Sequence, residues 1–380
     1  MAQHPDVIVI GGGVIGAACA LRLAQRGMRV TLLDRGKAGG EASPAGAGII
    51  TFGSFTRQDP LAILRRRSVS MYAEWTAEIH QASGIDPEHD PVGGLDLIYD
   101  DNQLAAAERE VQAARSANGA SDGEPVAERL SREATLEAEP ILSGAYESSL
   151  LRRDISVVDN PRLIEALLGA AAKAGVTAMM NARAMDFEIE AGSVRAVSTA
   201  TDRMPCGRVL LCAGAWSASL GTRLGLSEVS YPVRGQIVLL RARPGVLRRT
   251  IAFGAHYLVP RRDGRILIGS TEEHQAGFDD RATASAAQNL LQATERFAPG
   301  LMAFPIERTW AGLRPGSVDG APVIGRVPGR NNAFVATAHF RGGLTLAPGT
   351  AEMVEQMICD GADEEPMFAP ARRAIASARA

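Results

Sequence analysis

Apolar and small residues follow one another along the first 34 residues in an order that predicts a strand, a turn, a helix and a second strand. Val7 to Ile10 is a short β-branched run, as a buried parallel strand requires. Residues 17–26 carry apolar side chains at helical spacing, and Gly27 stands where such a helix is expected to end. Residues 29–33 are predicted to form a second strand, which ends at Asp34. The pattern therefore predicts a βαβ unit.

The rest of the chain also separates into helical and strand-like patterns. Helical spacing of apolar residues predicts helices over residues 60–81, 159–175, 281–298 and 353–358. Short apolar runs predict strands within residues 176–211, 231–270 and 333–337, with a hairpin turn at Arg262–Gly264. Because βαβ patterns flank a strand-rich insert, we expect an α/β nucleotide-binding domain interrupted by a second sheet domain.

Three glycines at the first predicted turn indicate a ligand. Gly11, Gly13 and Gly16 form a GxGxxG sequence after the strand and before the helix. In a dinucleotide site the first glycine allows the tight turn, the second lets backbone approach a pyrophosphate, and the third lets helix and strand pack closely. The helix N-terminus adds unpaired N–H groups for the phosphates. A glycine-rich turn without a ligand is the alternative interpretation.

Asp34 restricts which dinucleotide is expected. Its carboxylate would accept hydrogen bonds from ribose hydroxyls and would repel the 2′-phosphate of NADP, so NAD and FAD remain. A second small-residue segment, residues 41–50, would let backbone pass closely along an elongated cofactor. A flexible surface loop explains that segment equally well, so the choice stays open at this point.

Charge and cysteine content narrow the class of function. The net charge of −3 gives no case for binding nucleic acid or an anionic membrane. The densest basic run, residues 65–67, falls inside a predicted helix and is interpreted as a solvated helix face. The sequence contains no apolar stretch of about 18 residues, no secretory signal pattern and no CxxC pair. We therefore expect a cytoplasmic protein with reduced thiols, no transmembrane segment and no metal site.

Five motifs along the chain together resemble one family. They are the glycine fingerprint that ends at Asp34 and the segments 41–49, 211–216, 257–271 and 311–344. The last of these begins with Ala-Gly-Leu-Arg-Pro and ends with His-Phe-Arg-Gly-Gly-Leu, and these two motifs are the most specific. The set resembles the FAD-dependent D-amino-acid oxidase superfamily, and within it the glycine oxidase branch linked to thiamine biosynthesis.

The resemblance implies an FAD-binding Rossmann-like domain of the glutathione-reductase type, interleaved with an antiparallel-sheet substrate domain. The FAD-binding domain is expected to comprise residues 1–85, 146–225 and 315–370. The substrate-binding domain is expected to comprise residues 86–145 and 226–314, and residues 371–380 form a tail. We also expect a homo-oligomer, because glycine oxidases that resemble this chain assemble into one.

The resemblance implies a catalytic set of Arg314, Tyr257 and Arg341. Arg314 would bind the substrate carboxylate, which a planar guanidinium matches with two parallel hydrogen bonds. Tyr257 would lie over the substrate and donate its hydroxyl near the same carboxylate, and Arg341 would lie near the flavin and the substrate. A surface charge is the plain alternative for an arginine, and core packing is the alternative for a tyrosine.

Two further residues are candidates for the substrate pocket. His339 is expected there, although a packed histidine explains it equally well. Glu272 stands where glycine oxidases often place an apolar residue near the substrate, so its carboxylate would favour a cationic or larger amine, or would point into solvent. No cysteine stands near Arg314, where relatives that oxidise sarcosine attach the flavin. The FAD is therefore expected to be non-covalent.

The resemblance also implies the cofactor contacts. The helix N-terminus after the second glycine turn would point at the pyrimidine end of the flavin and stabilise negative charge on the reduced ring. Ala184 would touch the adenine end through its backbone. The expected FAD-binding residues are Gly11, Gly13, Val14, Ile15, Gly16, Asp34, Arg35, Ala42, Ser43, Ala47, Gly48, Ile49, Ala184, Gly214, Trp216, His339, Phe340, Arg341, Gly342, Gly343, Leu344 and Thr345.

The expected reaction is oxidation of glycine or another small amino acid by hydride transfer to flavin N5, with molecular oxygen as the acceptor. The products would be hydrogen peroxide and an imine, which hydrolyses to ammonia and a keto acid (glyoxylate from glycine). Three alternatives stay open. They are a D-amino-acid, sarcosine or proline-type dehydrogenase with another acceptor, a non-catalytic flavin-binding protein, and an NAD-dependent dehydrogenase.

Overall fold

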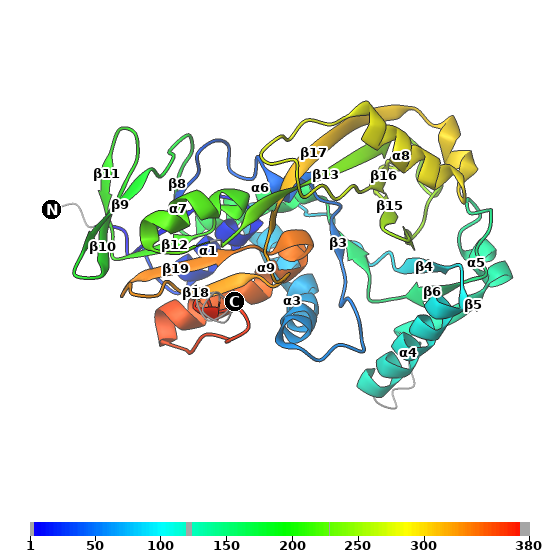
Figure 1. The fold of residues 1–380 in the computed structure, drawn as a ribbon, viewed down its shortest axis with the longest axis horizontal. Helices are drawn as coiled ribbons and strands as arrows, with labels where there is room; N and C mark the ends of the chain where they lie inside the picture. Colours follow the sequence, from blue (N-terminus) through cyan, green and yellow to red (C-terminus); the bar gives the residue numbers. More distant parts are fainter. Residues whose placement is uncertain (1–3, 119–123, 228, 373–380) are drawn as a thin grey trace.

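Two large β-sheets lie at opposite ends of the molecule, with helices packed on both (Figure 1). The computed structural model describes residues 4–118, 124–227 and 229–372. The expected tail falls mostly on residues 373–380, which lie outside the described residues. The predicted α/β class, with a parallel sheet and a second, largely antiparallel sheet, is confirmed.

A six-stranded sheet contains the βαβ unit predicted from the first 34 residues, with β1 and β2 side by side and parallel. Its order is β18-β19-β12-β1-β2-β8, and all neighbours are parallel except the antiparallel edge pair β18–β19. Every residue of β1 and β2 is buried, as the β-branched run predicted for β1. The strands are β1 (Val7–Ile10), β2 (Val30–Leu33), β8 (Thr177–Met179), β12 (Arg208–Leu211), β18 (Val323–Arg326) and β19 (Ala333–Thr337).

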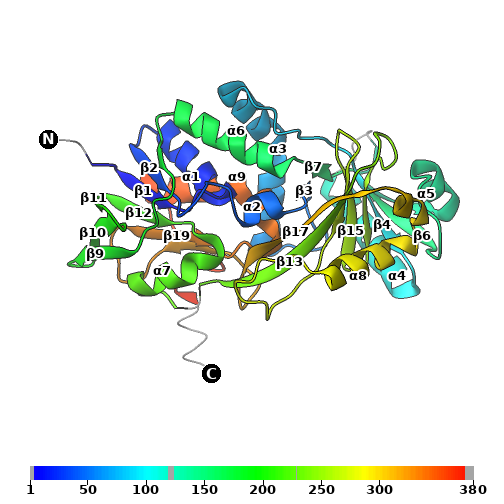
Figure 2. The same cartoon turned by 90° about the horizontal axis from the view of Figure 1, so that it is seen from above.

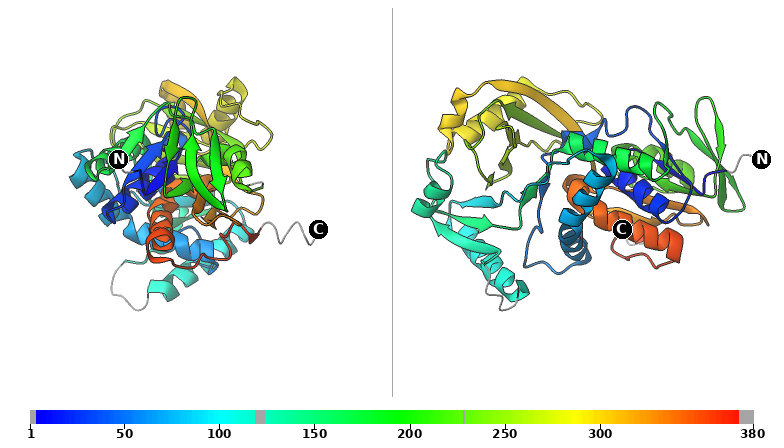
Figure 3. Two further views of the ribbon diagram at one scale, coloured as in Figure 1. Left: turned by 90° about the vertical axis from the view of Figure 1, so that its left-hand side faces the viewer. Right: turned by 180° about the vertical axis from the view of Figure 1, so that it is seen from behind.

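Helices cover one face of this sheet and form the largest core with it (Figure 2). They are α1 (Val14–Gln25), α3 (Pro60–Ser83), α6 (Asn160–Lys173) and α9 (Gly343–Glu355), and Figure 3 shows α3 beside α9. Asp59 and Asp159 accept hydrogen bonds from the first turns of α3 and α6, which fixes where these helices begin. The opposite face packs against α7 (Ser217–Leu224) and a three-stranded sheet of β9 (Asp186–Glu190), β10 (Ser193–Ser198) and β11 (Arg203–Pro205).

The eight-stranded sheet has the order β17-β13-β16-β15-β14-β4-β6-β5. All its neighbours are antiparallel except β4 and β14, which are parallel. These two strands come from distant parts of the chain, so no hairpin sets their relative direction. The strands are β4 (Gly94–Ile98), β5 (Ala127–Ser131), β6 (Ser148–Arg152), β13 (Tyr231–Leu240), β14 (Thr250–Phe253), β15 (His256–Pro260), β16 (Ile266–Gly269) and β17 (Ile306–Gly316).

Helices α4 (Asp101–Asn118), α5 (Arg132–Ala138) and α8 (Ala284–Glu295) lie around the eight-stranded sheet. The hairpin predicted at Arg262–Gly264 is confirmed, because β15 and β16 pair antiparallel on either side of it. The last helix begins ten residues before the predicted segment, at Gly343, and continues through Pro348. Strands β4 to β6 were not predicted, because each is short and their hydrophobic pattern is interrupted by polar residues.

A buried ion pair ties the segment after the short strand β3 (Ile49–Ile50) to the end of β6. The Asp154 side chain is fully buried, and its Oδ2 lies 2.8 Å from Nη2 of Arg152. Asp154 also accepts hydrogen bonds from the Thr51 hydroxyl at 2.8 Å and the Phe52 N–H at 3.0 Å. The segment after β3 is therefore fixed against the end of β6, a strand of the eight-stranded sheet.

We expect Asp154→Asn to lower the free energy of unfolding by about 3–5 kcal/mol, because it leaves the buried guanidinium of Arg152 without its counter-charge. The measurement is a urea titration of the protein with its cofactor. Asp186→Asn is the control, since its pair with Arg223 is exposed and contributes less than about 1 kcal/mol. A loss no larger than that of the control would contradict this account.

Candidate functional site

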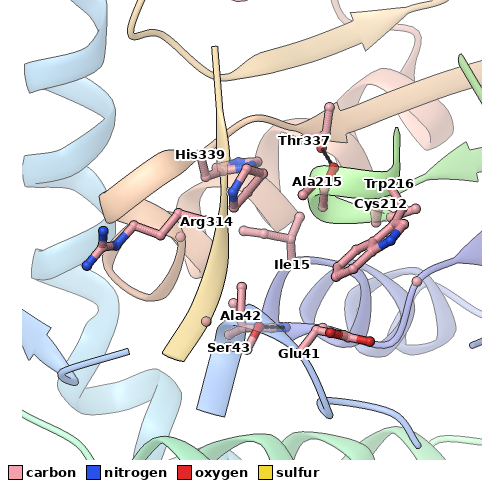
Figure 4. Close-up of a pocket in the computed structure, with 18 of the residues that line it drawn as sticks. Ile15, Glu41, Ala42, Ser43, Cys212, Ala215, Trp216, Arg314, Thr337 and His339 are labelled. Carbon is pink, nitrogen blue, oxygen red and sulfur yellow. Dashed lines mark hydrogen bonds between the residues drawn. The ribbon is translucent and has the colours of Figure 1, made fainter. Parts of the chain in front are cut away.

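A cavity of about 550 Å³ joins the two sheets. On one side it reaches the carboxyl ends of β1 and β2, where parallel sheets commonly bind ligands. On the other side it is lined by residues of β13, β15 and β17. Figure 4 shows Arg314 and His339 on one side of this space and Trp216 and Glu41 on the other. The cavity is therefore long enough to take a ligand that spans both halves.

The turn between β1 and α1 has the geometry that the glycine fingerprint predicted. Gly11 has a φ of +108°, and a Cβ there would collide with the carbonyl of Cys212. Gly13 precedes α1 and has no side chain that could cap it, so the first turn of the helix keeps N–H groups for a ligand besides that of Val14, which donates to Ser43. A Cβ on Gly16 would collide with the carbonyl of Gly11. Gly16 therefore allows helix and strand to pack closely. It was expected among the FAD-binding residues, but it does not line the cavity.

The second small-residue segment is part of the cavity wall and is not a free surface loop. It forms the short helix α2 (Ala42–Ala45) and continues into β3. Side chains from elsewhere bind its carbonyl groups: Arg261 Nη2 donates to Ala47 at 2.9 Å, and Trp310 Nε1 donates to Ala45 at 3.1 Å. Ser43 accepts the N–H of Val14 at 3.0 Å (Figure 4). The segment is therefore fixed against the glycine turn.

One end of the cavity lies beside η1 (Gly214–Trp216) and the end of β2. Arg35 stacks on the Trp216 ring, 3.6 Å from its centroid, and forms an ion pair with Glu41. Asp34 lines the same end, and one of its oxygens accepts the Gly12 N–H at 2.8 Å. Each carboxylate oxygen has a second lone pair, so Asp34 keeps acceptor capacity for a ribose hydroxyl.

Arg314 enters the cavity from β17 and has no carboxylate within ion-pair distance among the described residues. Its Nη1 donates to the Thr271 carbonyl at 3.0 Å, and its Nη2 donates to the Ser270 hydroxyl at 2.7 Å. Burial lowers its pKa from the usual value. The guanidinium lies directly against Gly235, where a Cβ would collide with it. The protein groups that hold the Arg314 guanidinium are therefore neutral, and no carboxylate among the described residues forms an ion pair with it.

Tyr257 lies beside Arg314 on the neighbouring part of the same sheet. Its ring packs against Gly269 of the paired strand, where a Cβ would lie 2.7 Å from the phenolic oxygen. The side chains of Arg314 and Tyr257 therefore each rest on a glycine. A fixed guanidinium and a phenol at one end of a cavity are suited to binding a carboxylate.

Arg341 also lines the cavity, but its charge is partly compensated. Its Nη1 lies 3.5 Å from Oε2 of Glu272, and the other Glu272 oxygen lies 2.9 Å from Nε2 of His274. Glu272 is partly exposed and does not line the cavity. The suggested role of Glu272 toward a cationic amine is therefore less favoured, because the carboxylate already pairs with the guanidinium of Arg341 and lies outside the cavity wall.

His339 is both packed and adjacent to the cavity. It is 5% exposed, and its Nε2 lies 3.1 Å from the Thr350 hydroxyl. Burial lowers the pKa of His339 to about 3. The imidazole is therefore neutral near pH 7.

The structure brings most of the predicted residues to this cavity. Gly342 and Glu272 do not line it, whereas Arg65, Gly235, Cys212 and Thr337 do and were not predicted. The interpretation of residues 65–67 as a solvated face is wrong for Arg65, because the second turn of α3 faces the cavity. The predicted residues that line it are Gly11, Gly13, Val14, Ile15, Asp34, Arg35, Ala42, Ser43, Ala47, Gly48, Ile49, Ala184, Gly214, Trp216, Tyr257, Arg314, His339, Phe340, Arg341, Gly343, Leu344 and Thr345.

The residues present fit a flavin dinucleotide. A backbone cradle at Gly11 and Gly13 lies at the open N-terminus of α1, where a pyrophosphate would be stabilised. The N-terminus of α9, also without a side-chain cap, faces the other end of the cavity. None of the described helices is long and apolar enough to cross a membrane.

Comparison with known proteins agrees with this geometry. A family model described as FAD dependent oxidoreductase matches residues 6–357. A glycine oxidase of Pseudomonas putida is 35% identical over 96% of this chain and 97% of its own length. A bifunctional protein ThiO/ThiG of Synechocystis is 31% identical over 95% of this chain and 52% of its own length. The crystal structure of a glycine oxidase from Geobacillus kaustophilus matches with a TM-score of 0.89 and 31% identity, covering 97% of this chain and 99% of that chain.

We expect Gly235→Ala to displace the guanidinium of Arg314 and to raise KM for the substrate about tenfold or more while FAD stays bound. The measurement is steady-state kinetics with the visible spectrum of the flavin as a check. Gly300→Ala, at an exposed position of the 3₁₀ helix Pro299–Ala303 outside the cavity, is the control. An unchanged KM in Gly235→Ala would show that the glycine does not seat Arg314.

We expect the buried neutral His339 to make the fold sensitive to acid. The pKa of His339 is lowered in the folded protein, so burial of the neutral imidazole contributes fully to the free energy of unfolding above about pH 6.5. This contribution is lost as the pH falls from 6.5 toward about 3. The free energy of unfolding of the wild type should therefore fall by about 2 kcal/mol more than that of His339→Asn between pH 6.5 and 5. Equal losses in both proteins would contradict the burial of a neutral imidazole.

Proposed function

The chain belongs to the family of FAD-dependent oxidoreductases, and we propose that it oxidises glycine or another small amino acid. Its cofactor is FAD, so the choice between NAD and FAD that the sequence left open is decided. The NAD-dependent alternative is accordingly wrong. The similarity of the whole chain to glycine oxidases supports the proposed substrate class.

The observation that carries the proposal is the uncompensated guanidinium of Arg314 beside Tyr257. Arg314 uses two of its five N–H groups on protein oxygens, so N–H groups on both terminal nitrogens remain for a ligand. A substrate carboxylate would accept hydrogen bonds from these N–H groups and would provide the counter-charge that the buried guanidinium lacks. A non-catalytic flavin-binding protein would not need such a clamp.

We infer that catalysis relies on positioning. When bound, FAD supplies the acceptor for the two electrons and the hydrogen of the substrate α-C–H bond, at its N5 atom. Arg314 and Tyr257 would hold the carboxylate at one end of the cavity and so direct the α-carbon of the substrate along it. His339, which is neutral and bonded to Thr350, supplies no charge to this step.

The proposed overall reaction converts an amino acid, oxygen and water into a keto acid, ammonia and hydrogen peroxide. An imine forms first and hydrolyses in water, and oxygen takes up the two electrons with two protons. Glycine gives glyoxylate. We extend the proposal to a cytoplasmic homo-oligomer, as expected from the sequence.

We propose that the FAD is bound without a covalent bond. Cys212 lines the cavity near the glycine turn, but burial and the neighbouring Cys19 raise the pKa of its thiol well above the usual range. The thiolate needed for attachment would therefore be scarce. Denaturation should release free FAD into the supernatant.

We expect purified protein to form about one hydrogen peroxide per amino acid consumed, with glycine, sarcosine, D-alanine and D-proline as the panel. Rapid reduction of the flavin and of an added dye with almost no peroxide would instead identify a dehydrogenase with another acceptor. Failure of every amine to bleach the flavin in the absence of oxygen would contradict the proposed function.

We expect Arg314→Ala to keep FAD and to lower kcat/KM by a factor of about 10² to 10⁴, because two charge-assisted hydrogen bonds of about 1.5–3 kcal/mol each are lost. Arg308→Ala, an exposed arginine on the same strand, is the control and should leave kcat/KM within about twofold of wild type. An unchanged kcat/KM in Arg314→Ala would remove this residue from the substrate site.

A further inference from the structure

Arg65 brings a second uncompensated positive charge to the cavity. It lies in the second turn of α3, is partly buried and lines the cavity wall. Its guanidinium makes no hydrogen bond or ion pair with any residue in the described part of the chain. Burial lowers its pKa, as expected for a guanidinium that leaves water without gaining an acceptor.

Other arginines that the fold buries are given acceptors. Arg152 pairs with Asp154, and Arg261 donates to the carbonyls of Val158 at 2.7 Å and Ala47 at 2.9 Å. The next residues in α3 are also satisfied: Arg66 donates to the Arg57 carbonyl, and Arg67 pairs with Glu352 at the surface. Arg65 therefore lacks a hydrogen-bond partner among the described residues because its side chain lines the cavity.

The guanidinium of Arg65 lies at the N-terminus of α9. A Cβ on Gly342, the residue that precedes this helix, would be 3.4 Å from Nη2 of Arg65. The uncapped helix end carries partial positive charge, so two sources of positive potential meet at one corner of the cavity. Arg314 and Tyr257 approach from the eight-stranded sheet instead, which leaves this corner free of the substrate clamp.

We propose that Arg65 faces the pyrimidine edge of the bound FAD and stabilises the negative charge that this edge gains on reduction. A flavin that accepts a hydride at N5 carries one additional negative charge, shared between N1 and the C2 carbonyl oxygen. Arg65 gives up no proton and forms no covalent bond in this process. The proposal rests on FAD as the cofactor and not on the identity of the substrate, so the two proposals fail independently.

The test compares the holoenzyme with Arg65→Met, Arg65→Lys and Arg67→Met. The two-electron midpoint potential of the bound FAD is measured by anaerobic titration against reference dyes. We expect Arg65→Met to lower the equilibrium constant for reduction about tenfold, which corresponds to about 30 mV. Arg65→Lys should recover most of this change, and Arg67→Met should show none because its guanidinium lies on the surface.

A second readout uses sulfite, which adds to flavin N5 and leaves the same negative charge on the ring. Its dissociation constant should rise about tenfold in Arg65→Met, in parallel with the change in potential. Neither measurement needs an amino acid, so both hold even when glycine is not the substrate. If Arg65→Met fails to retain FAD, Arg65→Gln decides by the same two measurements.

The proposal is overturned if the charge-removing variant keeps both values close to those of the wild type. This means an equilibrium constant for flavin reduction and a dissociation constant for sulfite that each change by less than about twofold. A specific alternative would show itself in the same variants. If KM for an amino dicarboxylic acid rises while the potential is unchanged, Arg65 binds a second carboxylate of the substrate and not the flavin.

Discussion

A guanidinium held away from water with no carboxylate beside it is the constraint that shapes this cavity. Such a charge is costly unless it gains hydrogen bonds, and a ligand anion lowers the cost further. Arg314 receives only neutral partners from the protein, and Arg65 receives none among the described residues. The open N-termini of α1 and α9 add positive potential at the same cavity. The interior is therefore complementary to phosphates and carboxylates before any ligand arrives.

The register of two long strands decides where the Arg314 side chain lies. In the β13–β17 pair, Gly235 lies opposite Gly312, and Arg314 lies opposite Val233. The Arg314 guanidinium then folds onto Gly235, while the missing Cβ of Gly312 leaves room for Ala45 of α2. A slip of one residue would turn these side chains to the other face of the sheet. The same strand pair thus places both the Arg314 guanidinium and the small-residue segment.

Much of this architecture could be predicted from the sequence because its signals are local. The glycine turn, the first strands and helix, and the starts of α3 and α6 each depend on a few neighbouring residues. Arg65 could not be predicted, since helical spacing does not show whether a face meets solvent or a cavity. The pairing of Glu272 with Arg341 joins segments about 70 residues apart, and no local pattern records it. The parallel pairing of β4 with β14 could not be predicted for the same reason.

The central claim is that Arg314 and Tyr257 bind the substrate carboxylate in the cavity that holds FAD. A crystal structure of the FAD-bound protein with an unreactive small carboxylic acid, such as acetic acid, tests it most directly. The account predicts the carboxylate within hydrogen-bond distance of the Arg314 guanidinium and the Tyr257 hydroxyl, on the side of the cavity formed by the eight-stranded sheet. A carboxylate bound elsewhere in the cavity, with these two side chains free, would contradict it.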